Sequence, residues 1–257
     1  MFEVDQIPTA LRRYVPDGAT LTFPTQGMTS EVAIVGGGHP VVLKRCRNAL
    51  YLSWLSREQQ VLKLLEHSGL PMPRLVDYTE TADDGRREMW LVMSRLQGRD
   101  LRSELQAANP RRRVELYRHV GLLLRRLHAT PVPSGFATDA PWIDRQLTQA
   151  AQNLSWCDGT PELLADLHRR RPPPVSEVLI HGDLALDNVL IDADGTMSLI
   201  DWSGGDVGDP RFDISLALRT ETTNVSQDQI AAFFNGYGDV PLDERTQQWF
   251  EQLYEFF

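Results

Sequence analysis

Short apolar runs in the first part of the chain are typical of β-strands. The runs at 32–35 and 41–44 lie on either side of three consecutive glycines, which predicts two strands joined by a tight turn. A second pair of strands is predicted at 74–78 and 89–93, with a polar stretch at 81–87 between them. We therefore expect a small antiparallel sheet in this part of the chain.

A different spacing of apolar residues predicts one helix between the two strand pairs. Between 50 and 67, apolar residues lie at helical spacing, namely Leu55, Val61, Leu62 and Leu65. A Ser-Gly pair and a proline follow at 68–71, and such residues end helices. The order of elements up to about residue 95 is therefore sheet, helix, sheet.

Helical periodicity dominates from Asp100 onward and is clearest between 114 and 127. Three short strands interrupt it, at 178–180, 189–191 and 197–200, and helix returns from 211 to the end. Loops at the ends of short strands in a helical region commonly carry functional residues.

The change of pattern at 94–98 indicates a boundary between two lobes. We expect an α+β protein with a small amino-terminal sheet lobe at 1–94, which contains one helix, and a larger, mainly helical lobe at 95–257. The segment 94–98 is expected to act as a hinge.

Composition narrows the class of protein. The 257 residues are 42% hydrophobic and 24% charged, which is ordinary for a globular chain. A net charge of −9 argues against nucleic acid as the main partner and suits a small cationic ligand. No apolar run approaches the roughly 20 residues of a membrane span, and the amino terminus lacks an export signal. We expect a cytoplasmic protein, a monomer or weak dimer, that does not bind membranes.

The strongest functional signal is a set of polar residues at the ends of the three short strands. Asp183 and Asn188 lie between the first strand and the second, and Asp201 follows the third. An aspartate with an asparagine five positions later has the spacing of the protein-kinase catalytic loop, where the aspartate orients the attacking hydroxyl and accepts its proton. Asn188 and Asp201 offer the oxygen ligands that Mg²⁺ prefers. The pattern predicts phosphoryl transfer from a nucleoside triphosphate with Mg²⁺.

Residues of these types are also common in turns, which is the simpler explanation for any one of them alone. The spacing of all three, next to apolar strands, favours the kinase interpretation. His181 is interpreted differently, as a structural residue that holds the loop and not as a proton shuttle.

A kinase also needs a cation that grips the phosphates. Lys44 ends the second predicted strand, and Glu58 on the following helix is its natural partner; the alternative for Glu58 is an exposed helix glutamate. The loop at 25–30 stands where a glycine-rich phosphate loop is expected, although it holds a single glycine. Backbone N–H groups from Met28 on and the hydroxyls of Thr29 and Ser30 can still reach phosphate oxygens.

With these residues in view, the chain resembles the aminoglycoside phosphotransferase family over nearly its whole length, and is most similar to the 3′-phosphotransferases. The matching segments are Gln26-Gly27-Met28-Thr29, Leu43-Lys44, Leu70-Pro71-Met72-Pro73, Leu127-His128, His181-Gly182-Asp183-Leu184, Ile200-Asp201, Phe212-Asp213-Ile214 and Leu253-Tyr254-Glu255-Phe256-Phe257. The last segment is the most specific, because the phosphate-transfer motifs also occur in kinases of choline, fructosamine, homoserine and macrolides.

The resemblance implies a kinase-like fold and a set of functional residues. ATP or GTP is the implied donor, with its base bound by the hinge backbone at Ser94 and Leu96 and with Val42 where relatives carry an aromatic residue. In the family, the terminal carboxylate and nearby acids bind substrate amines, which implies that Glu221, Glu255 and Phe257, together with Asp183, contact the acceptor.

Two departures from the family concern the acceptor. Tyr254 stands where the family has an aspartate, and Glu221 lacks the acidic neighbours that relatives carry. An arginine that commonly follows the metal-binding aspartate is also missing, since the sequence there is Trp202-Ser203-Gly204-Gly205. We expect a less acidic acceptor pocket than in the family.

We therefore expect an Mg²⁺-dependent O-phosphotransferase that modifies an aminoglycoside antibiotic and confers resistance to it. The alternative is a kinase of another small cationic or hydroxylated metabolite, which the less acidic pocket favours. A nucleotide-binding pseudokinase that acts as a scaffold is a third hypothesis, and the presence of all the catalytic residue types argues against it.

Overall fold

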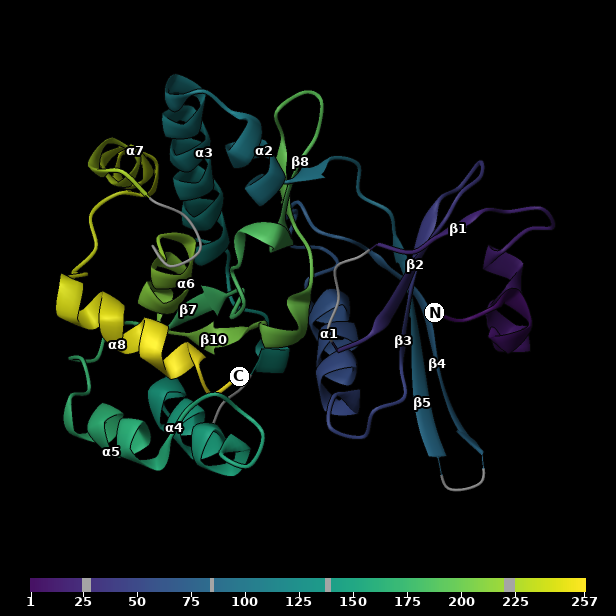
Figure 1. Ribbon diagram of the computed structural model, residues 1–257, viewed down its shortest axis with the longest axis horizontal. Helices are drawn as coiled ribbons and strands as arrows, with labels where there is room; N and C mark the ends of the chain where they lie inside the picture. The colour runs from purple at the N-terminus through teal and green to yellow at the C-terminus, as the bar shows by residue number, and fades with distance from the viewer. Residues whose placement is uncertain (25–28, 84–85, 137–139, 220–224) are drawn as a thin grey trace. The chain divides into compact units, whose positions relative to one another are not determined.

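The computed structural model describes residues 1–24, 29–83, 86–136, 140–219 and 225–257. The chain divides into two compact units (Figure 1). One consists of Met1–Gly98 with Ser198–Gly204, and the other of Arg99–Met197 with Gly205–Phe257. The first unit thus includes the short segment Ser198–Gly204, which is distant in sequence from the other residues of this unit.

The first unit is built on a five-stranded antiparallel sheet with the strand order β1-β2-β3-β5-β4. Its strands are β1 (Leu21–Thr22), β2 (Glu31–Val35), β3 (Val41–Cys46), β4 (Leu75–Asp83) and β5 (Arg86–Ser94). The predicted hairpin of β2 and β3 is present. The strands β4 and β5 extend from both sides into the polar stretch that was predicted to link them, and cross-strand contacts such as the ion pair between Arg87 and Glu80 accompany this extended ladder.

Opposite faces of this sheet are covered by different segments (Figure 1). The amino-terminal 3-10 helices η1 (Val4–Gln6) and η2 (Thr9–Tyr14) cover one face. There, Phe2, Ile7 and Leu11 pack with inward residues of the strands such as Leu43 and Trp90. The other face is covered by α1 (Leu52–Leu64), which is slightly shorter than predicted. Because strand residues alternate between faces, Lys44 points to the α1 side.

The second unit is mainly helical. Its helices are α2 (Leu101–Ala107), α3 (Pro110–His128), α4 (Trp142–Asn153), α5 (Pro161–Arg169), α6 (Pro210–Ala217), α7 (Gln227–Tyr237) and α8 (Glu244–Tyr254), with short 3-10 turns η3 (Ser134–Phe136) and η4 (Leu186–Asn188). Short polar residues cap many of their amino termini; Asn109, Thr160 and Asp209 each accept a backbone hydrogen bond and precede a proline at the first helical position.

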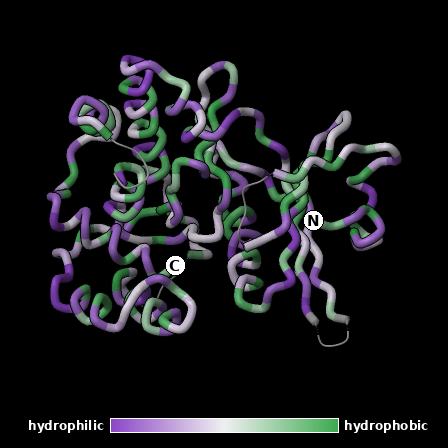
Figure 2. The backbone as a smooth tube through the Cα atoms, in the orientation of Figure 1, coloured by the Kyte–Doolittle hydropathy of each residue, from purple (hydrophilic) through white to green (hydrophobic). Residues whose placement is uncertain are grey.

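The longest helix, α3, is amphipathic, and green and purple alternate along it in Figure 2. Its apolar side is buried, and it packs against α7 through two glycines. A Cβ atom on Gly121 would lie 2.1 Å from the carbonyl oxygen of Phe233, and one on Gly236 would lie 2.2 Å from that of Arg118. The two backbones therefore approach more closely than any larger residue allows.

Short strands in this unit hold the loops of interest. They are β6 (Arg99–Asp100), β7 (Val178–Ile180), β8 (Val189–Ile191) and β10 (Asp206–Gly208). The strand β6 pairs antiparallel with β8, and β7 pairs antiparallel with β10. From β8 the turn at 192–195 leads into β9 (Met197–Leu199), which carries the chain into the first unit, where it continues as η5 (Trp202–Gly204). The strands β1, β6 and β10 and both amino-terminal 3-10 helices were not predicted.

Within the ranges that the structure describes, no helix combines the length and the apolar character that crossing a bilayer requires.

Candidate active site

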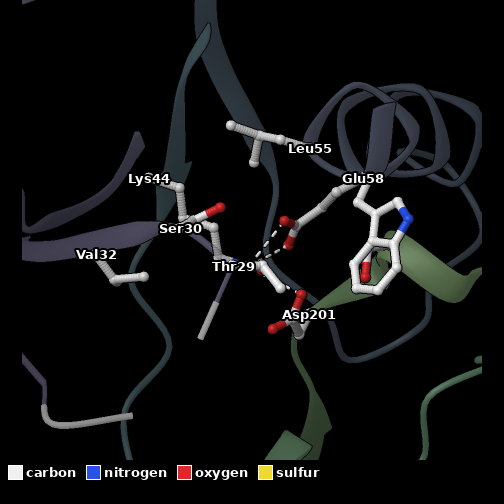
Figure 3. Close-up of a pocket in the computed structure, with 9 residues that line it drawn as sticks. Thr29, Ser30, Val32, Lys44, Leu55, Glu58 and Asp201 are labelled. Carbon is white, nitrogen blue, oxygen red and sulfur yellow. Dashed lines mark hydrogen bonds and ion pairs between the residues drawn. The ribbon is translucent and has the colours of Figure 1, made fainter. Parts of the chain in front are cut away.

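The first unit brings Lys44, Glu58 and Asp201 together (Figure 3). The Nζ atom of Lys44 lies 2.8 Å from each carboxylate oxygen of Glu58 and 3.1 Å from Oδ1 of Asp201. Glu58 is only 1% exposed, so it is not the exposed helix glutamate of the alternative interpretation. The sequence prediction of a lysine and glutamate pair on β3 and α1 matches this geometry.

Burial and charge act in opposite directions on this cluster. Burial by itself lowers the pKa of Lys44, but the carboxylates of Asp201 and Glu58 outweigh it and hold the pKa above its ordinary value. Burial raises the pKa of Glu58, and Lys44 opposes this effect. The lysine is therefore a fixed cation at neutral pH, held by two acids.

Asp201 has a left-handed backbone conformation with φ of 64°, which is uncommon for a residue other than glycine and is best tolerated by aspartate and asparagine. Trp202, which follows, is fully buried, and its indole Nε1 donates to the carbonyl oxygen of Leu199 at 3.1 Å. The backbone N–H of Trp202 also donates to Glu58 at 3.4 Å. These contacts fix the turn, while the Asp201 side chain stays 41% exposed.

A pocket surrounds the cluster. It is lined by Thr29, Ser30, Val32, Lys44, Trp54, Leu55, Glu58, Asp201 and Ser203. Figure 3 shows Thr29 and Ser30 close to Lys44, so the end of the predicted phosphate loop reaches the predicted cation. A pocket whose polar lining includes one lysine, three hydroxyls and an exposed carboxylate suits a phosphorylated ligand.

In the second unit, Asp183 lies in the loop after β7 and accepts hydrogen bonds at both of its carboxylate oxygens. Asn188 donates from Nδ2 to Asp183 Oδ2 at 3.0 Å and to the Asp183 carbonyl oxygen at 2.9 Å. The Tyr254 hydroxyl donates to Asp183 Oδ1 at 2.7 Å. The predicted pair of Asp183 and Asn188 is therefore in direct contact, and Tyr254 joins it from the end of α8.

Asp213 of α6 anchors this loop. Its buried carboxylate accepts hydrogen bonds from the backbone N–H groups of His181 at 2.7 Å and Gly182 at 2.9 Å. His128 contacts the same carboxylate at 3.1 Å and Tyr237 at 2.8 Å. Burial alone would raise the pKa of Asp213, but His128 and the His181 N–H hold it below its ordinary value. His181 is itself fully buried, as a structural residue would be.

The carboxy-terminal segment is fixed by three contacts. Glu255 forms an ion pair with Arg219, and its carbonyl oxygen accepts from the Gly159 N–H at 2.9 Å. The carbonyl oxygen of Phe256 accepts from Asn153 at 2.7 Å, and the Phe256 ring is fully buried. Phe257 is half-buried. Glu255 therefore already has a cationic partner in this structure.

The remaining predicted residues lie as follows. Val42 is on β3, two positions before Lys44 and on the same face of the sheet. Ser94 ends β5; its N–H donates to the Arg74 carbonyl oxygen and its Oγ accepts from the Arg74 N–H, both at 2.9 Å, and Leu96 follows it half-buried. Met28 and Glu221 lie outside the described residues.

Sequence reasoning missed the roles of Tyr254 and Asp213. Both belong to segments that were noted, but the hydrogen bond from Tyr254 spans 71 positions of sequence and that from Gly182 to Asp213 spans 31. The replacement of an expected acid by Tyr254 was the available signal.

Known proteins share sequence and fold with this chain. Residues 20–249 match the model of the phosphotransferase enzyme family. The chain belongs to this family. Among curated relatives, the phosphotransferase is 32% identical over 199 residues to an aminoglycoside 3′-phosphotransferase of Niallia circulans, with 73% of each chain covered. It is 31% identical over 224 residues to one of Streptomyces fradiae, with 79% of this chain and 80% of the relative covered.

Among solved structures, the phosphotransferase is similar to the aminoglycoside 3′-phosphotransferase of type VIII, with a TM-score of 0.77, 27% identity and 99% of both chains covered. These findings confirm the predicted resemblance, the kinase-like α+β fold and the enzyme class, a small-molecule kinase with a hydroxyl acceptor.

Proposed function

We propose that this enzyme transfers the γ-phosphoryl group of ATP or GTP to a hydroxyl of an aminoglycoside. The observation that carries the proposal is the contact of Asp183 with Asn188 at the spacing of a kinase catalytic loop. The two curated relatives, both aminoglycoside 3′-phosphotransferases, support the choice of acceptor.

The first unit supplies the nucleotide site in this proposal. Lys44, held by Glu58, neutralises phosphate charge, and the hydroxyls of Thr29 and Ser30 donate to phosphate oxygens. Val42 contributes an apolar surface for the base on the Lys44 face of the sheet. The Ser94 N–H is already paired with Arg74, so a hydrogen bond from the hinge to the base would use other backbone groups near Ser94 and Leu96.

The residues present fit a Mg²⁺ ion. Asn188 uses Nδ2 for its bonds to Asp183, which leaves its amide oxygen as the atom that can face a cation, and Asp201 has an exposed carboxylate. Among the described residues no group of three or more His, Cys, Asp or Glu side chains is arranged to hold a metal alone. Mg²⁺ in proteins usually binds one or two protein oxygen ligands and takes its other ligands from substrate phosphates and water. When bound, the ion supplies neutralisation of phosphate charge.

Asp183 acts on the acceptor. Its carboxylate orients the acceptor hydroxyl and takes the proton as the hydroxyl oxygen forms a bond to the γ-phosphorus. The bond from that phosphorus to the bridging oxygen breaks, and its electron pair leaves with the nucleoside diphosphate. Asn188 holds the carboxylate in place during this step.

A second candidate is a kinase of another small hydroxylated or cationic metabolite. Two observations favour it: Arg219 pairs with Glu255, and a tyrosine replaces the acid expected at 254. Both reduce the negative charge available to a polycation. Several expectations from the sequence stay predictions. They are the roles of Glu221 and Phe257 in acceptor binding, the lobe boundary at 94–98, a cytoplasmic location, and a monomeric or weakly dimeric state.

Mass spectrometry of the purified enzyme with Mg²⁺, either ATP or GTP, and separate panels of aminoglycosides and metabolites tests the choice. The proposal predicts addition of one phosphate to at least one aminoglycoside, faster than to any metabolite. Nucleotide hydrolysis without phosphorylated aminoglycoside would refute the acceptor, and a faster metabolite would establish the second candidate.

A further inference from the structure

Tyr254 contacts the catalytic aspartate directly. As the last residue of α8, it donates its hydroxyl to Asp183 Oδ1 at 2.7 Å. The other oxygen accepts from Asn188 at 3.0 Å. The Asp183 carboxylate is therefore held from two sides, by a residue five positions away and by one 71 positions away.

The position of the tyrosine ring is itself fixed. The Arg219 guanidinium lies over the ring, 5.6 Å from its centroid, and the Phe212 ring lies 6.2 Å away. Arg219 also pairs with Glu255, the next residue in the chain. Because Asn153 and Gly159 anchor the backbone just beyond Tyr254, the hydroxyl has little freedom to leave Asp183.

The charge of the residue at this position matters. A carboxylate beside Asp183 would disfavour its ionised form, which is the form that accepts a proton, whereas a neutral phenol donor favours it. A carboxylate oxygen has two acceptor positions, so a bond from Tyr254 does not by itself exclude an acceptor hydroxyl at the same oxygen.

We propose that Tyr254 is a positioning residue that fixes the Asp183 carboxylate for attack by the acceptor hydroxyl. The proposal rests on the function proposed above for Asp183. In this arrangement Arg219 and Phe212 hold the phenol, the phenol holds the carboxylate, and Tyr254 takes no part in the proton transfer itself.

The test compares Tyr254→Phe with Tyr14→Phe. Tyr14 is a matched control because its hydroxyl also donates to an aspartate, Asp77, at 3.1 Å, within the first unit. We expect Tyr254→Phe to lower kcat about tenfold, both for transfer to an aminoglycoside and for nucleotide hydrolysis, with the nucleotide KM changed less than about twofold. Tyr14→Phe should match the wild type in kcat, and the two variants should have similar Tm values.

A second measurement separates positioning from a merely structural role. If Tyr254 acts through Asp183, then Tyr254→Phe in an Asp183→Asn background should change the residual single-turnover rate by less than about twofold. The proposal would be overturned if Tyr254→Phe had the kcat of the wild type. It would also be overturned if Tyr254→Phe lowered the rate by the same factor with Asp183 present and in the Asp183→Asn background. Nucleotide hydrolysis uses water as the acceptor, so its rate reports on Tyr254 even if the enzyme phosphorylates no aminoglycoside. A failure to phosphorylate any aminoglycoside would count against the proposed acceptor and not against the role of Tyr254.

Discussion

The Lys44 ammonium lies 2.8 Å from both carboxylate oxygens of Glu58, and both side chains are buried. A buried lysine without a carboxylate partner is costly, so Glu58 is needed both to keep the ammonium charged and to keep it in place. This ion pair is the central contact of the proposed nucleotide site.

We expect Glu58→Gln to lower kcat/KM for the nucleotide. Removing the charge leaves Lys44 paired with Asp201 alone and draws the ammonium toward that residue. The expected loss in kcat/KM for the nucleotide is about 10- to 100-fold. Steady-state kinetics with varied ATP measures it. Glu66→Gln, at an exposed position just past α1, is the control, and equal kinetics for the two variants would contradict this role of Glu58.

The contact of α3 with α7 predicts a large effect of adding a single methyl group. Gly121→Ala would place a Cβ atom 2.1 Å from the carbonyl oxygen of Phe233, and backbone cannot give way as a flexible side chain can. We expect a loss of about 2–3 kcal/mol or more in the free energy of unfolding. Urea denaturation measures the loss. Gly38→Ala is the control, because its Cβ atom would meet nothing within 4 Å; similar losses in both variants would refute the packing argument.

We expect the stability of the protein at alkaline pH to depend on Tyr237. Burial, with smaller contributions from Asp213 and Asp209, raises the pKa of Tyr237 from 10.0 to about 12. Folding therefore favours the neutral phenol, and this contribution is complete below the unfolded pKa and is lost as the pH rises through the folded pKa. We expect the free energy of unfolding to fall less in Tyr237→Phe than in the wild type between about pH 9.5 and about pH 11.5.

Denaturation curves at the two pH values measure this difference. Tyr14→Phe removes the phenol that donates to Asp77, and it controls for the loss of a tyrosine elsewhere. If the free energy of unfolding fell equally in the wild type and in Tyr237→Phe, Tyr237 would not contribute to the loss of stability at alkaline pH.

Extension of the chain beyond Phe257 is expected to affect the acceptor more than the nucleotide. The segment before it is anchored by Asn153 and Gly159, so an added tag changes the terminal carboxylate and not the fold of α8. We expect the acceptor KM to rise about threefold or more, with an unchanged nucleotide KM. Kinetics of tagged protein before and after proteolytic removal of the tag provide a matched pair, and identical acceptor KM values would remove Phe257 from the acceptor site.

Local sequence patterns were sufficient to predict much of the fold and part of the site. The hairpin of β2 and β3, the helix α1 and the pairing of Lys44 with Glu58 follow from short-range periodicity and spacing. Asp183 and Asn188 are five positions apart, so their contact also depends on local structure.

Other features depend on tertiary contacts that no local pattern encodes. Tyr254 reaches Asp183 only because α8 packs beside the loop after β7 within the second unit, and Asp213 binds that loop only because α6 does the same. The strand β10 is three residues long and forms because β7 offers it a partner. The strands β4 and β5 were predicted too short because exposed polar residues can continue a ladder once the hairpin has formed.

The central claim is that Asp183 promotes phosphoryl transfer without contributing to nucleotide binding. Single-turnover transfer from ATP to an aminoglycoside, measured together with the Kd for ATP in the wild type and in Asp183→Asn, tests it most directly. The account predicts a rate lower by about a hundredfold or more in the variant, with a Kd within about threefold of the wild type. A variant that transfers phosphate at the wild-type rate would contradict the account.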